Sequence, residues 1–186
     1  MTAKTHNVGA VLAGLTVHQA VFEKADLLMT GIFFGSCLIS STLADISHPE
    51  SRVGRRIRPV SAWIYHHVGH RGATHCLISL AVLILIPLIG IIFDVEHMFW
   101  GGLGFFIGQA THIILDLLNE PGVALFFPKE KRYRLLKLKT GGLGEYLILF
   151  LMLGLIIWLL SDVTIYWYER FLENLSQFFF FEYLIN

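Results

Sequence analysis

The sequence predicts an all-helical membrane protein: a bundle of about five spanning helices with one basic segment lying along the surface. Hydrophobic residues make up 55% of the 186 residues and charged residues only 15%, against about 25% charged residues in a typical soluble domain. The apolar residues are concentrated in long runs, and a spanning helix needs about 20 of them. Histidines and carboxylates lie at the edges of these runs, which indicates a functional site there.

Five stretches have the length and composition expected of spanning helices. They are residues 7–22, 27–44, 75–93, 98–118 and about 144–160. The second is rich in Gly, Ser and Thr, which suits close helix packing in lipid, and Pro87 is expected to kink the third. Residues 52–70 mix Arg and His with apolar side chains and are predicted to lie along the membrane surface.

We expect one membrane-embedded domain over residues 1–186. Residues 1–150 carry the motifs described below, and residues 161–186 form a polar and aromatic tail. The two cysteines, Cys37 and Cys76, are too few for a disulfide framework. With 14 basic and 14 acidic residues the net charge is zero, so we expect no nucleic-acid partner.

The distribution of Lys and Arg predicts the orientation in the membrane. Four arginines lie in residues 52–58 and six basic residues in 129–139, whereas residues 94–97 contain none. By the positive-inside rule both basic loops face the cytoplasm. We therefore expect a multi-pass inner-membrane protein with a cytoplasmic N-terminus and the C-terminus outside.

This topology brings the strongest ligand candidates to one depth near the cytoplasmic face. They are His6, Asp45, His70, His75, His112, Asp116 and Glu145. A charged side chain in hydrocarbon costs roughly 2.5–3.5 kcal/mol on insertion scales, so groups that gather at one depth are expected to bind something. Imidazole and carboxylate are the usual ligands of a divalent metal.

The spacing of the candidates leaves alternatives open. His112 and Asp116 are four residues apart, so they share a helix face and could hold one ion or form a surface hydrogen bond. His70 and His75 flank a glycine whose backbone permits a tight bend, which could bring both rings together or leave them as interfacial polar groups. Arg71 could hold an anionic group such as phosphate.

Three further residues are less certain ligands or catalysts. Asp45 and His48 bracket a short turn before a proline, where they could bind metal or cap a helix end. Glu145 could act at the site or stabilise the first turn of a helix through the helix dipole.

These motifs, in this order, resemble a known family over roughly residues 1–150. The matching segments are His6 in a Thr-His start, Asp45-Ile-Ser-His-Pro-Glu-Ser51, Gly69-His-Arg-Gly-Ala-Thr-His75, His112-Ile-Ile-Leu-Asp116, the stretch from Gly122 to Pro128, and Thr140-Gly-Gly-Leu-Gly-Glu145. They are similar to the LexA-regulated inner-membrane proteins classed as metal-dependent hydrolases. The resemblance implies a bacterial inner-membrane protein whose metal site is formed by Asp45, His70, His75, His112 and Asp116.

The hydrolase class of this family reflects a likeness to zinc-dependent phospholipases. The family's acidic turn reads Asp-Ile-Asp-His, and Ser47 stands here in place of the second aspartate. That replacement argues against a second metal, or a fully acidic set of ligands, at this turn.

The expected function is a metal-dependent hydrolase that cleaves a phosphoester or related ester of a lipid-borne substrate at the cytoplasmic interface. The expected cofactor is zinc, with manganese or another divalent ion as alternatives. The expected ligands are His70, His75, His112 and Asp116, with Asp45 as a fifth ligand or the base, His6 and His48 as further ligands, and Arg71 and Glu145 as catalytic groups. Two other functions remain open: a non-enzymatic membrane protein with a structural or sensed metal, and an ion-coupled transporter, which predicts polar residues through the full thickness of the spans.

Overall fold

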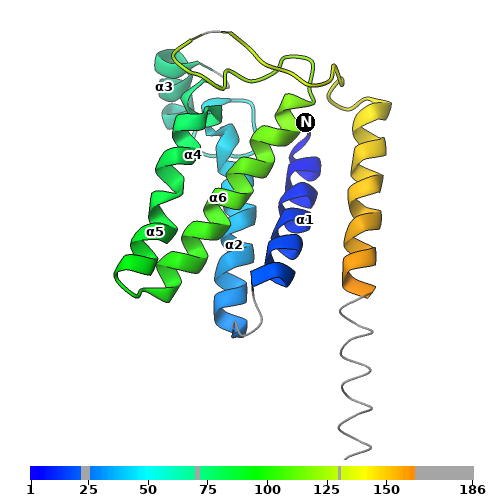
Figure 1. Cartoon of the computed structure of the whole chain (residues 1–186). Helices are drawn as coiled ribbons and strands as arrows, with labels where there is room; N and C mark the ends of the chain where they lie inside the picture. The colour runs from blue at the N-terminus through cyan, green and yellow to red at the C-terminus, as the bar shows by residue number, and fades with distance from the viewer. Residues whose placement is uncertain (22–25, 70–71, 130, 162–186) are drawn as a thin grey trace, which may run out of the picture.

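The computed structural model describes residues 1–21, 26–69, 72–129 and 131–161 (Figure 1). Its helices are α1 (Ala3–Val21), α2 (Leu27–Leu43), α3 (Arg58–Val68), α4 (Leu77–Leu83), α5 (Leu85–Ile92), α6 (Glu96–Leu117) and a last helix over Leu143–Ser161, with 3-10 turns η1 (Ala44–Ser47) and η2 (Ala73–His75). The described residues contain isolated bridges but no strand. The all-helical prediction is confirmed, whereas His70, Arg71 and the tail from residue 162 lie outside the described residues.

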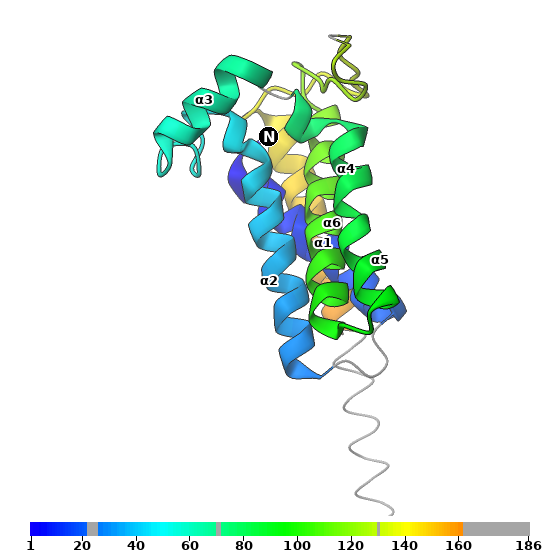
Figure 2. The same cartoon turned by 90° about the vertical axis from the view of Figure 1, so that its left-hand side faces the viewer.

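The helices pass up and down a single bundle, and α2 and α6 run side by side in the same direction (Figures 1 and 2). Two contacts define their register: the Ser40 hydroxyl donates to the Phe105 carbonyl at 2.6 Å, and His112 lies beside the Ser41 carbonyl. α1 runs in the opposite direction against both helices. The last helix runs parallel to α1, packing Met152 in one apolar cluster with Met1 and Leu115.

Two glycines of α6 allow its backbone to come into contact with the backbone of α2. A Cβ atom at Gly104 would collide with the Phe33 carbonyl oxygen, and one at Gly108 would collide with that of Cys37. Small residues of this kind let helix backbones come together in lipid, where no hydrophobic effect drives the helices into contact. The close packing expected of α2 is present, but the glycines that allow it lie on α6, since a Cβ atom at Gly31 or Gly35 of α2 would meet nothing within 4 Å. This approach brings the end of α2 next to the end of α6.

Three helices are long and apolar enough to cross a membrane: Leu27–Ser47, Glu96–Leu117 and Leu143–Ser161. Each of the five predicted spans is helical in the structure, but two of them do not meet this criterion of length and apolar composition. α1 carries polar residues at both ends, and neighbouring helices satisfy them, as where Gln19 donates to the Leu159 carbonyl at 3.1 Å. The passage Leu77–Ile92 is apolar but short.

Pro87 explains the break between α4 and α5. A proline has no N–H and clashes with the carbonyl four residues earlier, which here belongs to Leu83, the last residue of α4. α5 begins two residues later, at Leu85. The predicted kink is therefore confirmed.

Both basic loops lie at the end of the bundle where α1 begins. The segment from η1 to η2 includes α3, which projects to one side of the bundle, and the segment between α6 and the last helix crosses the same end (Figures 1 and 2). α3 has a proline in its first turn and is followed by Gly69, whose φ of 74° suits a glycine. The predicted surface segment 52–70 is thus partly an irregular turn and partly the helix α3.

Candidate metal centre

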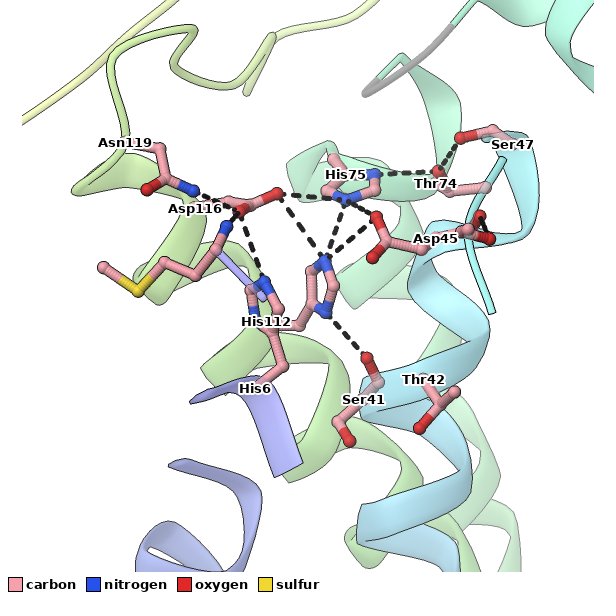
Figure 3. Close-up of polar contacts among 12 residues, drawn as sticks. His6, Ser41, Thr42, Asp45, Ser47, Thr74, His75, His112, Asp116 and Asn119 are labelled. Carbon is pink, nitrogen blue, oxygen red and sulfur yellow. Dashed lines mark hydrogen bonds and ion pairs between the residues drawn. The ribbon is translucent and has the colours of Figure 1, made fainter. Parts of the chain in front are cut away.

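Four side chains from three separate parts of the chain point toward one another at this end of the bundle (Figure 3). Asp45 comes from η1, His75 from η2, and His112 and Asp116 from the last turns of α6. One ligand atom from each residue lies within 4.8 Å of the corresponding atoms of the other three. Among the described residues these four form the group that could hold a metal ion.

The distances between the ligand atoms fit one small ion. The Nε2 atoms of His75 and His112 are 3.1 Å apart. Asp45 Oδ1 lies 3.8 and 3.6 Å from these two nitrogens, and Asp116 Oδ2 lies 3.5 and 3.6 Å from them. Ligand bonds of 2.0–2.2 Å in tetrahedral geometry require ligand atoms about 3.3–3.6 Å apart. The five distances above, 3.1–3.8 Å, are close to this spacing, so the donor set is near the size of a four-coordinate site.

His112 is oriented by the backbone of α2. Its Nδ1 donates to the Ser41 carbonyl at 2.7 Å, and because a carbonyl can only accept, Nδ1 carries the proton. In the neutral ring this leaves the Nε2 lone pair directed at the other three ligand atoms. A carbonyl partner behind the ring is a common arrangement for metal-binding histidines.

His75 is oriented by a chain of hydroxyl groups. Its Nδ1 lies 2.9 Å from the Thr74 hydroxyl, which in turn lies 3.2 Å from the Ser47 hydroxyl. The Gln109 side chain donates to the Thr74 carbonyl and so holds η2 against α6. Burial lowers the pKa of His75, which lies outside the spanning helices, and this favours the neutral ring that a metal ligand requires.

The second oxygen of Asp116 faces away from the four-residue group and is held by other polar groups. Asp116 Oδ1 accepts hydrogen bonds at 2.9 Å from the Met1 amine and from the Asn119 side chain. His6 Nε2 is 3.4 Å from the same oxygen, and the His6 ring stacks on His112 with centroids 3.7 Å apart. These contacts fix the carboxylate so that Oδ2 points at the two histidines.

The centre is deeply buried but open on one side. The side chains of His75, His112 and Asp116 are fully buried, whereas that of Asp45 is 24% exposed. A cavity of about 10 Å³ lies beside Asp45 and His6, which is close to the smallest volume that holds one water molecule. The buried Nδ1 of His6 has no hydrogen-bond partner among the described residues.

The other predicted site residues occupy different positions. His6 lies next to the four-residue group but contacts the outer oxygen of Asp116. His48 follows η1 at its C-terminal end, outside the group. Glu145 is buried elsewhere and accepts hydrogen bonds from the Thr2 backbone at 2.6 Å, the Gly141 backbone at 2.7 Å and the Thr5 hydroxyl.

Several residues around the centre were not predicted from the sequence. Thr74, Asn119 and the Ser41 carbonyl orient the candidate ligands, and Arg52 lines the small cavity. Asn119 could have been found because it follows Asp116 by three residues at a helix end. Ser41 could not, because its role depends on the register of α2 against α6.

The fold and the centre define a class: a polytopic helical membrane protein with a buried His and Asp cluster at one end of its bundle. Within that class, the chain belongs to the YdjM inner membrane protein family, which matches residues 1–183. The predicted membership of an inner-membrane protein family is thereby confirmed, whereas its hydrolase class stays a prediction.

Individual relatives support the same assignment. The chain is 33% identical over 150 residues to the uncharacterized protein YvsG of Bacillus subtilis (strain 168), covering 80% of this chain and 88% of that protein. It is 28% identical over 165 residues to the inner membrane proteins YdjM of Escherichia coli (strain K12) and Shigella flexneri, covering 85% of this chain and 81% of each. No solved structure matches the chain significantly.

Proposed function

We propose that this protein is a membrane-embedded, metal-dependent hydrolase that cleaves a phosphoester of a lipid-borne substrate at the cytoplasmic face of the inner membrane. The observation that carries the proposal is the group of Asp45, His75, His112 and Asp116, whose ligand atoms lie within 4.8 Å of one another. Zinc is the favoured ion, because the two imidazoles and the Asp116 carboxylate are ligands that suit it and would leave its fourth position to a water beside Asp45. Manganese or another divalent ion remains an alternative.

The electrostatics of the group support a bound cation. Two carboxylates surround two imidazole nitrogens, and His112 Nε2 carries a lone pair rather than a proton when the ring is neutral. Buried acceptors of this kind are costly unless a cation or a donor compensates them. A divalent ion at their centre would compensate all four at once.

The residues beside the group support hydrolysis. A bound divalent cation would polarise a phosphoryl oxygen and lower the pKa of a bound water towards about 7. Asp45 is the partly exposed member of the group and lines the small cavity, so it is placed to orient a water and accept its proton. His6 lines the same cavity, and its Nδ1 is available for a second hydrogen bond to that water.

The reaction needs no co-reactant except water. The water oxygen forms a new bond to phosphorus while the bond from phosphorus to the lipid alcohol oxygen breaks, and that oxygen takes up a proton. The two basic loops at this end of the bundle support a cytoplasmic location, by the positive-inside rule. A substrate with a polar head and an apolar tail suits a centre at the end of spanning helices.

A structural or sensed metal is the second candidate, and the full burial of His75, His112 and Asp116 favours it. The partial exposure of Asp45 and the cavity beside it favour an open, catalytic centre instead. For a transporter, polar ligands would be needed along the whole passage, whereas the four-residue group lies at one end.

The test measures metal and turnover in the same preparations. Full-length protein purified in detergent is analysed for bound metal and then screened for phosphate release from lipid phosphoesters. We expect one divalent ion per chain in the wild type, loss of the ion in His75→Ala and Asp116→Ala, and retention in His97→Ala, an exposed histidine outside the group. The rate of phosphate release should fall in the two variants that lose the ion and stay unchanged in the control.

Two results would contradict the proposal. Unchanged metal content in both ligand variants would show that the ion, if any, binds elsewhere. Bound metal without release of phosphate from any lipid phosphoester would leave the structural or sensed metal as the better account.

A further inference from the structure

An apolar groove on the lipid-facing side of the bundle leads to the candidate metal centre. The groove has a volume of about 320 Å³ and is lined by Asn7, Leu38, Ile39, Thr42, Leu43 and Val53. Leu38 and Ile39 belong to the spanning helix Leu27–Ser47 and are exposed. Leu38 precedes Asp45 by seven residues, which is about 10 Å along a helix, so the groove lies at the depth of lipid chains below the centre.

The groove adjoins the small cavity beside the centre. Asn7, Thr42 and Val53 line both the groove and the cavity, and the cavity is lined on its inner side by His6 and Asp45. A molecule lying in the groove therefore ends next to the residues proposed for hydrolysis.

A second groove adjoins the cavity. It has a volume of about 290 Å³, and Arg52 lines both this groove and the small cavity. Lys4 also lines the second groove. Arg52 is exposed and forms no ion pair with a carboxylate in the part of the chain that the structure describes.

The one acidic side chain among the residues lining the second groove offsets only one of these two cations, so a net positive charge is left. Glu145 lines this groove, but its carboxylate is buried and accepts hydrogen bonds from Thr2, Thr5 and Gly141. Arg52 and Lys4 therefore offer positive charge and hydrogen-bond donors to an anion at the junction. A guanidinium is well suited to bind two phosphate oxygens together.

We propose that the two grooves and the cavity form one binding path for a phospholipid of the phosphatidic acid type. This inference rests on the proposed function and deepens it. One acyl chain lies in the groove lined by Leu38 and Ile39, and the phosphate lies between Arg52 and Lys4. The bond between phosphate and glycerol then lies beside Asp45, because the cavity separates the two grooves.

The test measures binding without turnover. The probe is a phosphonate analogue of phosphatidic acid, which water cannot cleave at phosphorus, with a fluorophore at the end of one acyl chain. A diacylglycerol with the same labelled chain serves as the probe without a headgroup charge. Dissociation constants are measured for the metal-loaded, full-length protein in detergent.

We expect the phosphonate to bind more tightly than the diacylglycerol, and Arg52→Gln to weaken its binding about tenfold, the factor for one lost charge-assisted hydrogen bond. Arg55→Gln is the matched control, because Arg55 is exposed in the same loop and lines neither groove. It should change the affinity less than about twofold. Val53→Trp should block the junction and weaken binding of both probes.

Equal affinity for the two probes, or an Arg52→Gln variant that binds like Arg55→Gln, would overturn the phosphate position. Unchanged binding by Val53→Trp would overturn the chain position. Bound metal in each variant shows that the fold is intact. If the protein hydrolyses lipid phosphoesters in a metal-dependent way but gives these negative binding results, the proposed function is supported and the lipid-binding path is contradicted. If it shows the expected binding pattern but no hydrolysis, the lipid-binding path is supported and the proposed function is contradicted.

Discussion

The Nε2 atoms of His75 and His112 face each other at 3.1 Å, and each ring is held from behind through its Nδ1. Thr74 holds one ring, and the Ser41 carbonyl holds the other. Asp45 and Asp116 lie within 3.8 Å of the same two nitrogens. Two buried histidines aimed at each other between two carboxylates form a centre that a cation would stabilise.

The first prediction concerns removal of the metal. Chelation should lower the thermal stability, because buried acceptors that shared a cation then lack compensation. For an ion present at 100 times its dissociation constant, the lost stabilisation is about 2.7 kcal/mol, or a fall in Tm of about 5–10 °C. Thermal unfolding with and without chelator measures this difference, which should shrink in Asp45→Asn. An equal effect of chelator on wild type and on Asp116→Ala would argue against the site.

The second prediction concerns the hydroxyl chain behind His75. Thr74→Val keeps the shape of the side chain but removes the partner of His75 Nδ1. Loss of such a partner typically weakens metal binding by about 10–100-fold, and a metal titration would measure it. Ser47→Ala, one step further away, should have a smaller effect. Thr16→Val is the control, because the Thr16 hydroxyl donates to the Leu12 carbonyl on its own helix, far from the centre.

A metal affinity of Thr74→Val equal to that of Thr16→Val would show that this hydroxyl does not position the ring. Ser47 stands where the resemblance noted in the sequence leads us to expect a second aspartate. Its contact with Thr74 gives the residue a role in the present chain that does not require a second metal.

The third prediction concerns the packing of α2 against α6. Gly108→Ala places a methyl group against the Cys37 carbonyl and should destabilise the protein by about 1–3 kcal/mol, the usual cost of overpacking. Gly35→Ala is the matched control on α2, because its Cβ would meet nothing within 4 Å. It should be neutral or stabilising by up to about 1 kcal/mol. Thermal unfolding of both variants checks the difference, and equal stabilities would contradict the observed approach.

Part of the metal centre could be predicted from the sequence, and part depends on contacts between helices. The i, i+4 spacing of His112 and Asp116 places both on one helix face, and the arrangement of the basic loops predicts one depth for the candidates. The partners of the rings depend instead on helix register. Gly104 and Gly108 set that register by contact with backbone atoms of α2, and a single sequence does not show which carbonyl a glycine will meet.

The fold was predictable to a similar degree. Composition and apolar runs were enough for an all-helical bundle, and Pro87 for the break in one passage. The predicted count of five spans treats every passage alike, whereas three meet the criterion of length and apolarity. α1 is more polar because His6 and Asn7 face the centre and its neighbours rather than lipid. Arg52 was read only as a sign of topology, because nothing in the sequence places it beside Asp45.

The fourth prediction separates two roles for Glu145. The residue was predicted to be catalytic, and its hydrogen bonds to Thr2, Thr5 and Gly141 tie the start of the chain to the last helix. Glu145→Gln should lower the stability by about 1–3 kcal/mol through weaker hydrogen bonds, while the bound metal stays unchanged. Unfolding and metal analysis of the same sample measure both. A variant of normal stability that has lost turnover would support the catalytic role instead.

The last prediction concerns the orientation of the bundle. Both basic loops lie at the end that carries the metal centre, and residues 94–95 lie at the other end. If the positive-inside rule holds, a cysteine placed at Arg55 or Lys139 is shielded from a membrane-impermeant thiol reagent in intact cells, and one at Asp94 is labelled. The native Cys37 and Cys76 are buried, so the background should be low. Labelling at Arg55 and Lys139 but not at Asp94 would place the centre on the outer face, where a cytoplasmic lipid substrate could not reach it.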